Sequence, residues 1–499
     1  MRRLLLVALA VAAAVAAAVA AGGVVLYARA ELSNVGTLQF ANALRIPPLL
    51  EPHDGGDRKL FDLTLQHGRA ELLAGKPTET WGANGTYLGP TLRAERSDHV
   101  EVRVRNELPE TTTIHWHGMH LPASADGGPH QTIGPGETWR PSWHVEQPAA
   151  TLWYHPHLHQ ETADHVYRGI AGMFIIDDPK TGVRLPDEYG VNDIPLIIQD
   201  KRLNDDGSLD FSQDVISSTG RLGDTILVNG TFDPYLDVHQ ERVRFRLLNA
   251  SNARIYNVGF ADDREFDLIA TEGGLLETPR RLTRIQLSPG ERAEIVVAFE
   301  PTERVVLRSF EPELGTNFFE NRFAGGDDIF DLVQLRAAPT LVPSSEMPAR
   351  LAAHQHFHEQ DAVRTRRFEL NGISINDKTM DMHRIDEVVA AGTIEIWDVH
   401  NASGTPHSFH PHGVSFRVIT VGALLPAQLS GWKDTVYVPP GETLRLVVRS
   451  PDYADPHVPY MFHCHVLQHE DRGMMGQFVV VEPGHEGELP THDHPEGGS

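Results

Sequence analysis

Four short histidine pairs carry the strongest chemical signal in the sequence. They are His115-Trp-His117, His155-Pro-His157, His410-Pro-His412 and His463-Cys-His465. On a β-strand, residues i and i+2 point to the same face, so each pair can direct two imidazoles toward one point. Because neutral imidazole is the commonest metal-binding side chain, the pairs are candidate metal ligands.

The last pair encloses Cys464, the only cysteine among 499 residues, which therefore forms no internal disulfide. On a strand its side chain points away from its two histidine neighbours, so one strand can serve two metal sites. His469 and Met474 follow it by five and ten residues, and His407 lies three residues before His410. A thiolate, two imidazoles and a weak thioether form a blue-copper electron-transfer site. Zinc and a nucleophilic cysteine are the alternatives, although structural zinc sites favour several cysteines and no catalytic context for a nucleophile is evident.

Three copies of one strand–turn unit position these residues. Each copy opens with the alternating apolar residues of a half-buried strand, in the stretches EVRVRNELPETTTIHWHG (101–118), RVRFRLLNASNARIYNVG (242–259) and EIWDVHNASGTPHSFHPHG (395–413). The alternation leads to Asn106, Asn249 and Asn401, and a Pro-Gly-Glu turn follows at 135–137, 289–291 and 440–442. The histidine pairs belong to the outer copies, whereas the middle copy has Asn252 and Tyr256 in that region.

The repeat predicts an all-β chain of three Greek-key β-sandwich domains, and the content of 43 glycines and 34 prolines agrees with many turns. We expect the domains at 45–183, 184–340 and 366–485, joined by a linker at 341–365 and followed by a disordered, histidine-containing tail at 486–499. The runs HQHFH in the linker and THDH in the tail are interpreted as solvated polar segments, with weak metal capture as the alternative.

Residues 1–30 predict an export signal or a membrane anchor. Arg2 and Arg3 precede an uncharged apolar stretch over 4–27, and Ala28-Arg29-Ala30 offers a small-x-small cleavage site. The stretch is also long enough to span a bilayer with its N-terminus in the cytoplasm. Both interpretations place residues 31–499 in the periplasm or outside the cell, and the paired arginines are compatible with twin-arginine export. The net charge of −25 argues against a nucleic-acid partner.

The motifs HWHG, WYHPHLH, HSFHPHG and HCHVLQHEDRGMM resemble, in this order, the four copper motifs of the three-domain multicopper oxidases. The likeness is to bacterial laccases and periplasmic copper-efflux oxidases, with bilirubin oxidases related, and it covers nearly the whole chain after the N-terminal segment. It implies three cupredoxin-like domains and four copper ions: one type 1, one type 2 and a type 3 pair. The third repeat and the cluster motifs exclude two-domain copper nitrite reductases.

The resemblance also implies a role for each ligand position. The type 1 copper would be held by His407, Cys464, His469 and Met474. The type 2 copper would be held by His115 and His410. The type 3 pair would be held by His117, His155, His157, His412, His463 and His465. Types 2 and 3 would form a trinuclear cluster between the first and third domains. Every ligand position of the motifs is filled, which favours a copper-loaded protein over a copper-free relative.

The reaction implied by the resemblance couples four one-electron oxidations of a reducing substrate to the four-electron reduction of O2 to water. Asp126 and Glu470 resemble the acidic residues that relay protons to the cluster, and a surface or turn-forming carboxylate is the alternative for each. We expect a monomer, with O2 and a small reducing substrate as its partners and a possible membrane tether through the N-terminal segment.

For the reducing substrate, phenols or aromatic amines, as in laccases, are favoured. Met380, Asp381 and Met382 form a candidate Cu(I) site, because thioethers suit Cu(I). However, the chain has nine methionines and no methionine-rich insertion, and Thr405 stands where we expect methionine in a cuprous oxidase. A non-catalytic copper-binding or structural protein on the same fold, like relatives that serve in cell division, is the alternative class.

Overall fold

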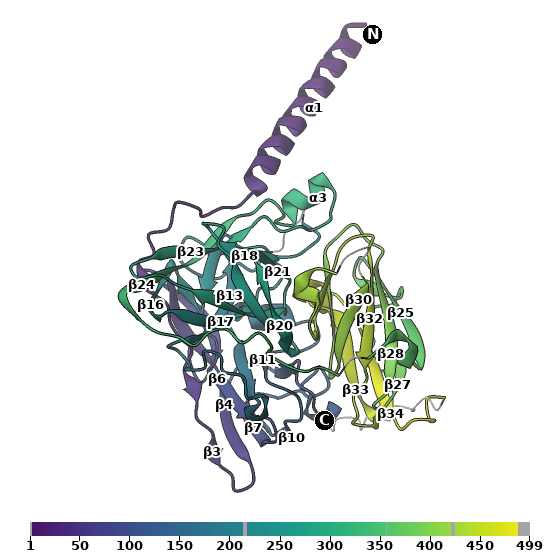
Figure 1. The fold of residues 1–499 in the computed structure, drawn as a ribbon. Helices are drawn as coiled ribbons and strands as arrows, with labels where there is room; N and C mark the ends of the chain where they lie inside the picture. The colour runs from purple at the N-terminus through teal and green to yellow at the C-terminus, as the bar shows by residue number, and fades with distance from the viewer. Residues whose placement is uncertain (1, 213–216, 356, 421–424, 488–499) are drawn as a thin grey trace.

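The computed structural model describes residues 2–212, 217–355, 357–420 and 425–487. In this part of the chain six β-sheets form three sandwiches in sequence order (Figure 1). Each sandwich encloses its own buried apolar core between two sheets. Most of the predicted tail, residues 488–499, and His356 of the linker lie outside the described residues.

The first sandwich lies within residues 49–177. One sheet contains β3 (His53–Asp54), β4 (Lys59–Leu73), β5 (Lys76–Ala83), β7 (His99–Asn106), β9 (Thr138–Trp139) and β10 (Ser142–His144). The other contains β2 (Leu49–Leu50), β6 (Thr91–Glu95), β8 (His115–His117), β11 (Ala150–His155) and β12 (Gly172–Asp177). The histidines of β8 and β11 thus belong to one sheet.

The second sandwich includes a short strand, β1, whose residues precede the first sandwich in the sequence. One sheet contains β1 (Asn42–Ala43), β16 (Pro234–Gln240), β18 (Tyr256–Phe260), β21 (Arg284–Leu287), β23 (Arg304–Phe310) and β24 (Phe330–Val342). The other contains β13 (Asp193–Lys201), β14 (Thr225–Val228), β15 (Thr231–Phe232), β17 (Arg242–Asn249), β19 (Phe266–Thr271), β20 (Gly274–Leu282) and β22 (Arg292–Ala298).

The third sandwich lies within residues 364–481. One sheet contains β25 (Arg364–Asn371), β26 (Ser374–Ile375), β28 (Ile394–Asn401), β30 (Ser415–Thr420) and β32 (Thr443–Arg449). The other contains β27 (Glu387–Ala390), β29 (His407–Pro411), β31 (Val436–Val438), β33 (Asp455–Cys464) and β34 (Met475–Val481). The histidines of β29 and β33 again share one sheet.

The sequence repeat is a structural repeat. The strands β7, β17 and β28, which open the three copies, each pair in parallel with the strand β4, β13 or β25 of the same sandwich. The buried asparagine that ends each opening strand uses its side-chain NH2 group to donate to two backbone carbonyls; these are Asn106, Asn249 and Asn401. The backbone carbonyl of each asparagine accepts a hydrogen bond from the backbone N–H of the glycine in the Pro-Gly-Glu turn. The asparagine and the turn therefore close the same loop in each copy.

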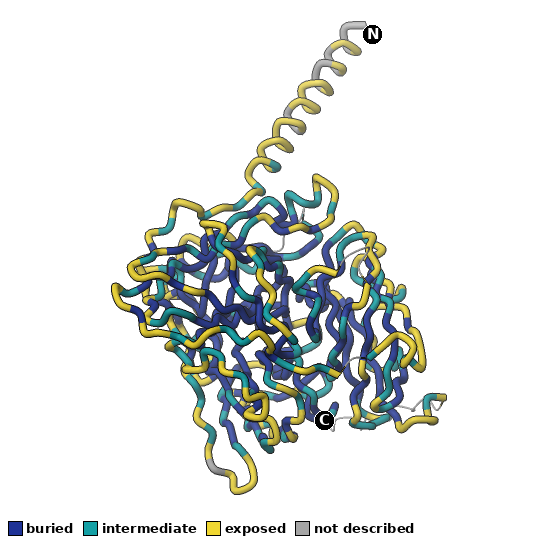
Figure 2. The backbone as a smooth tube through the Cα atoms, in the orientation of Figure 1, coloured by how far each residue is buried: buried dark blue, intermediate teal, exposed yellow. Residues whose placement is uncertain are grey.

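Helices are few and short in the described residues, apart from the first. They are α1 (Arg2–Ala30), α2 (Thr162–Arg168), α3 (Phe318–Phe323) and α4 (Leu467–Asp471), with 3-10 turns at Ala123–Ala125, Pro179–Thr181, Glu359–Asp361 and Ala427–Leu429. The α1 helix projects from the body and its described side chains are mostly exposed, whereas blue, buried segments fill the sandwiches (Figure 2). Its residues Ala12–Ala30 are long and apolar enough to cross a membrane.

Candidate metal centres

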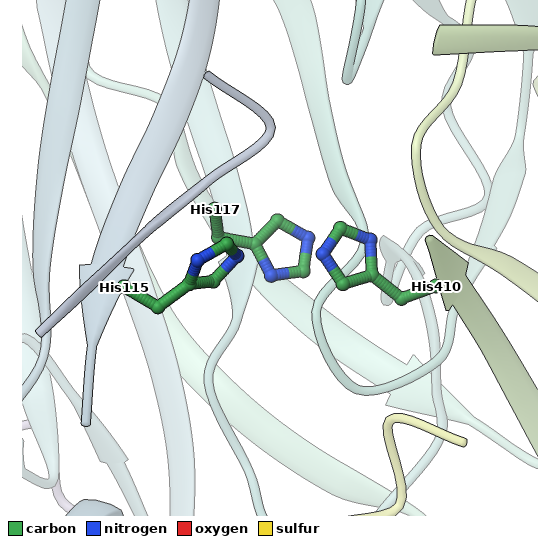
Figure 3. Close-up of side chains that lie close together, drawn as sticks. All are labelled: His115, His117 and His410. Atoms are coloured by element: carbon green, nitrogen blue, oxygen red, sulfur yellow. The ribbon is translucent and has the colours of Figure 1, made fainter. Parts of the chain in front are cut away.

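Eight buried histidines from the first and third sandwiches converge on one region. Three groups each bring one nitrogen per ring to within 4.8 Å of the others: His115, His117 and His410; His117, His155 and His465; and His157, His412 and His463. Each group joins residues of the first sandwich to residues of the third. Figure 3 shows His115 and His117 on one strand and His410 facing them from another.

Strand pairing explains this convergence. In the first sandwich β8 and β11 are antiparallel, and their register places His115 directly opposite His155. In the third sandwich β29 and β33 are antiparallel, and His410 lies opposite His463. His115 and His117 share one face of β8, because side chains alternate along a strand. In the other three pairs the second histidine lies one or two residues beyond the end of its strand and still reaches the same region. Two sheets thus present four histidines each to a common interface.

Hydrogen bonds fix the ring orientations. The Nδ1–H of His115 donates to the carbonyl of Asp126 at 2.9 Å, and that of His410 donates to the carbonyl of Asp434 at 2.8 Å. The Nδ1–H of His155 donates to the Pro156 carbonyl at 2.8 Å. In these rings Nε2 is left as the acceptor that faces the cluster, the arrangement that oriented metal-binding histidines use.

His117 is reversed relative to these rings. Its Nε2 lies 3.1 Å from the Asp434 carboxylate and 2.9 Å from the hydroxyl of Thr435. Its Nδ1 faces the Nε2 atoms of His155 and His465 at 3.4 and 3.2 Å. The free nitrogen of His117 therefore also points into the cluster, although it is the other nitrogen of the ring.

The donor set fits metal ions. The Nε2 atoms of His115 and His410 are buried and have no hydrogen-bond partner, which is costly for a polar atom unless a ligand completes it. Burial lowers the pKa of three of these histidines, to about 3 for His157 and well below the usual value for His117 and His412. These rings are neutral at physiological pH, and the neutral ring is the form that binds metals.

A second, mononuclear group surrounds the cysteine. The Sγ atom of Cys464 lies 3.4 Å from Nδ1 of His407 and 3.6 Å from Nδ1 of His469, and all three side chains are buried. Met474 is fully buried, and its backbone joins this group through hydrogen bonds with Cys464 at 3.1 Å and His469 at 2.9 Å. Burial raises the pKa of the Cys464 thiol to about 12, so a bound cation is needed to stabilise the thiolate.

The two regions are joined through consecutive residues. Cys464 belongs to the mononuclear group, whereas its neighbours His463 and His465 belong to two of the histidine groups. The backbone N–H of His465 donates to the Ser408 carbonyl at 2.6 Å, and Ser408 directly follows His407. A single covalent segment therefore connects the sulfur to the histidine cluster, as the alternation of a strand predicts.

The two predicted carboxylates both lie at the histidine cluster. The Asp126 carboxylate accepts from Nδ1–H of His412 at 2.7 Å. Glu470 lies 3.1 Å from Nδ1 of His463 and 3.5 Å from Nδ1 of His157. Both carboxylates are almost completely buried. They are therefore not surface groups, which was the alternative for each.

Gly127 holds Asp126 in place. Its φ of +78° is a left-handed conformation that favours glycine, and a Cβ atom there would lie 1.7 Å from the carbonyl oxygen of Ile114. The chain therefore turns back against the strand that carries His115. Asp126 therefore lies in a turn, as the alternative interpretation predicted, and its carboxylate also contacts His412 of the cluster.

The sequence analysis did not identify Asp434 and Arg292. Arg292 donates to both carboxylate oxygens of Asp434 at 2.7 Å, and neither side chain is more than 2% exposed. Asp434 in turn holds His117 and, through its carbonyl, His410. One signal was available: Arg292 directly follows the Pro-Gly-Glu turn of the middle copy, the copy without histidine pairs.

The structure places the candidate Cu(I) residues next to the mononuclear group but outside it. The backbone N–H of Met380 donates to the carbonyl of Gly473, the residue before Met474, at 2.9 Å. Met380 and Met382 are half-buried and Asp381 is exposed. Among the described residues, Asp381 joins none of the clusters that could hold an ion.

Comparison with known proteins finds relatives that cover most of the chain. Family models described as multicopper oxidase match residues 64–181, 204–308 and 346–484. The multicopper oxidase mco of Staphylococcus aureus is 34% identical over 466 residues, which is 90% of this chain and 95% of the relative. The cell division protein FtsP of Yersinia pestis is 38% identical over 445 residues, covering 88% of this chain and 92% of FtsP.

Solved structures agree in fold. The laccase of Pediococcus acidilactici Pa5930 has a TM-score of 0.80 and 33% identity, with 88% of this chain and 94% of that chain covered. CueO, a laccase-like multi-copper oxidase of Ochrobactrum sp., has a TM-score of 0.81 and 36% identity, with 88% and 100% covered. A metallo-oxidase of Campylobacter jejuni has a TM-score of 0.78 and 28% identity, with 91% and 98% covered.

Proposed function

The chain belongs to the multicopper oxidases, and we propose that it is a catalytically active, laccase-like member that oxidises phenols or aromatic amines and reduces O2 to water. The observation that carries the proposal is the convergence of eight buried histidines whose free ring nitrogens meet, beside a cysteine with two further histidines. A structural protein has no need to bury so many partly unpartnered nitrogen atoms.

Copper binding follows from the family, and we assign four ions to this chain. His407, Cys464, His469 and Met474 would hold the type 1 ion. His115 and His410, whose Nε2 atoms have no other partner, would hold the type 2 ion. The two remaining groups of three would hold the type 3 pair. When bound, these ions would supply one-electron acceptance at the cysteine and the four-electron reduction of O2 at the cluster.

The protein's own residues would orient the ligands, exclude water and supply protons. The hydrogen bonds that the imidazole rings donate to Asp126, Asp434 and Pro156 hold them in the orientation needed for binding. The segment 463–465 gives electrons a covalent route from the sulfur to the cluster. Asp126 and Glu470 touch ligand histidines from inside the protein, where a carboxyl group can pass protons to reduced oxygen.

The surface above the mononuclear group suits a phenolic substrate. Nε2 of His407 lies 3.0 Å from the Ser403 hydroxyl and 3.3 Å from the Thr405 hydroxyl, and these two residues are partly exposed. A phenol docked there would find hydrogen-bonding hydroxyls directly over a type 1 ligand. In contrast, Nε2–H of His469 donates to the backbone carbonyl of Ser218 at 2.7 Å, so no side-chain hydroxyl lies over that ring nitrogen.

Two other functions have specific observations in their favour. Oxidation of Cu(I) is favoured by Met380 and Met382, which lie beside the chain segment that leads into Met474. A non-catalytic role is favoured by the identity to FtsP. The complete set of candidate ligands argues against the non-catalytic role. A single backbone contact gives Cu(I) oxidation less support than the phenolic substrate has.

We further propose that residues 31–499 act outside the cytoplasmic membrane. The apolar helix over Ala12–Ala30 is compatible with an export signal or an anchor.

Copper loading and oxygen-electrode measurements test the function. We expect the copper-loaded protein to be blue and to consume O2 with a phenolic donor faster than with Cu(I). Cys464→Ser removes the thiolate and should abolish the colour and the activity while the fold is retained. A copper-replete protein that stays colourless and consumes no O2 with either donor would support the non-catalytic role, and a preference for Cu(I) would replace the phenolic substrate.

A further inference from the structure

The end of the apolar helix α1 packs against α3. The ring of Tyr27 stacks on Phe318 with centroids 5.1 Å apart and meets the edge of Phe323 at 6.2 Å. The Arg322 guanidinium lies 4.7 Å from the centre of the Tyr27 ring and forms an ion pair with Glu31. The α1 helix therefore leaves the body directly beside α3, as Figure 1 shows.

Two phenylalanines of α3 face outward next to this contact. Phe318 is 76% exposed and Phe319 is 56% exposed. Among the described residues they are the only aromatic side chains in the set of exposed large hydrophobics. Exposed aromatic groups of this kind mark interaction sites, and phenylalanines on short segments insert into the boundary between lipid headgroups and acyl chains.

The apolar segment at the end of α1 stops at the level of these side chains. The apolar segment Ala12–Ala30 has 19 residues. At 1.5 Å per residue it spans about 28 Å, close to the roughly 30 Å hydrocarbon thickness of a bilayer. The segment ends at Ala30, so the polar boundary falls near Tyr27 and Glu31. These are the residues that contact α3.

We propose that α1 is retained as a membrane anchor and that Phe318 and Phe319 insert into the lipid boundary beside it, so that the body rests on a phospholipid bilayer through α3. The chain carries a net charge of −25, so anionic lipids do not attract the body. The contact therefore depends on apolar insertion and requires no anionic lipid.

This docking surface borders the mononuclear group. The Ser218 hydroxyl donates to Glu320 of α3, and the Ser218 carbonyl accepts from the ring of His469. Docking through α3 would thus bring the electron-entry site to the membrane surface. Only this consequence rests on the proposed function; the docking itself does not.

A fluorescent label tests the docking in the full chain. Phe318→Cys is labelled with NBD and the protein is reconstituted into phosphatidylcholine vesicles; Cys464 is fully buried and does not react. His53→Cys is the matched control, because its side chain is 70% exposed and β3 lies at the end of the molecule opposite α1 (Figure 1). We expect a blue-shifted emission and quenching by a lipid-borne quencher at position 318 only, unchanged when anionic lipid is added.

Equal, water-like emission at both positions would overturn the proposal. So would a mature membrane-extracted protein whose mass shows that residues 1–30 have been removed. If the label at 318 prevents folding, Phe319→Cys replaces it with the same expected result. Oxygen consumption measured on the same vesicles reports the proposed function separately, so its failure leaves the docking result intact.

Discussion

Asp434→Asn should weaken both the fold and the copper cluster. The substitution keeps the shape of the side chain but removes its charge, so the Arg292 guanidinium, which is 0% exposed, loses its anionic partner and one of its two hydrogen bonds of 2.7 Å. Breaking a buried ion pair by removing one partner costs about 3–5 kcal/mol. We therefore expect a loss of this size in the stability of the metal-free protein.

The same substitution should lower copper affinity. Asp434 accepts from the ring of His117, and loss of such an outer partner typically costs about 10–100-fold in metal affinity, or roughly 1.4–2.8 kcal/mol. Thermal unfolding of the metal-free protein and copper retention against a chelator measure the two effects. The double variant Arg292→Met, Asp434→Asn removes the unpaired charge and should recover more than half of the lost stability.

Asp193→Asn is the matched control. It breaks an equally buried pair, in which Arg246 donates to both oxygens of Asp193 at 2.6 and 3.0 Å, but this pair contacts no ligand histidine. It should destabilise the protein and leave copper affinity unchanged. The reasoning is refuted if the single and double Asp434 variants are equally unstable, or if Asp434→Asn and Asp193→Asn retain copper equally well.

Three further predictions concern the histidine cluster and the mononuclear group. Asp126→Asn should slow turnover and leave the blue absorption intact, because Asp126 touches His412 and not the cysteine group; unchanged O2 consumption would remove its proton-relay role. The metal-free protein should lose stability as the pH falls from about 6.5 toward 4. In this range histidines of the unfolded chain bind protons, whereas buried His157 and His469, whose pKa values are lowered to about 3 and 4, do not. A melting temperature that stays constant over this pH range would contradict the prediction. Gly127→Ala should destabilise the protein by more than about 1 kcal/mol in thermal or denaturant unfolding. Gly136→Ala is the control, because Gly136 also has a positive φ but no atom near its missing Cβ, and it should destabilise the protein less. Equal losses would show that the contact with Ile114 is not the cause.

The sequence predicted which of these side chains would lie together, because strand geometry is local. Alternation along a strand places His463 and His465 on one face and Cys464 on the other, and the structure sorts the three residues in this way. The closing asparagines were also visible as a repeat. Spacing of this kind needs no knowledge of tertiary contacts.

Ring orientation and long-range partners were not predictable in the same way. The reversal of His117 depends on Asp434, and Arg292 lies 142 residues from that carboxylate. The Ser218 carbonyl that caps His469 is 251 residues away. The two-residue strand β1, which pairs with β16 of the second sandwich, is too short to show any periodicity. These features arise from the packing of one sandwich on another.

The middle sandwich shows why a copy without histidine pairs still belongs to the site. Its Pro-Gly-Glu turn reaches the cluster: a Cβ atom on Gly290 would lie 3.0 Å from the ring of His465, so only a glycine lets the turn approach so closely. Glu291 forms an ion pair with buried Lys433 at 3.0 Å, next to Asp434, and Arg292 binds Asp434 itself. In the outer copies the repeated unit carries the cluster histidines. In the middle copy the Pro-Gly-Glu turn and Arg292 pack against those histidines and against Asp434. The histidine cluster lies between the first and third sandwiches, so its geometry is fixed only if those two sandwiches are fixed relative to each other. The contacts of the middle sandwich with both sides of the cluster help to fix them.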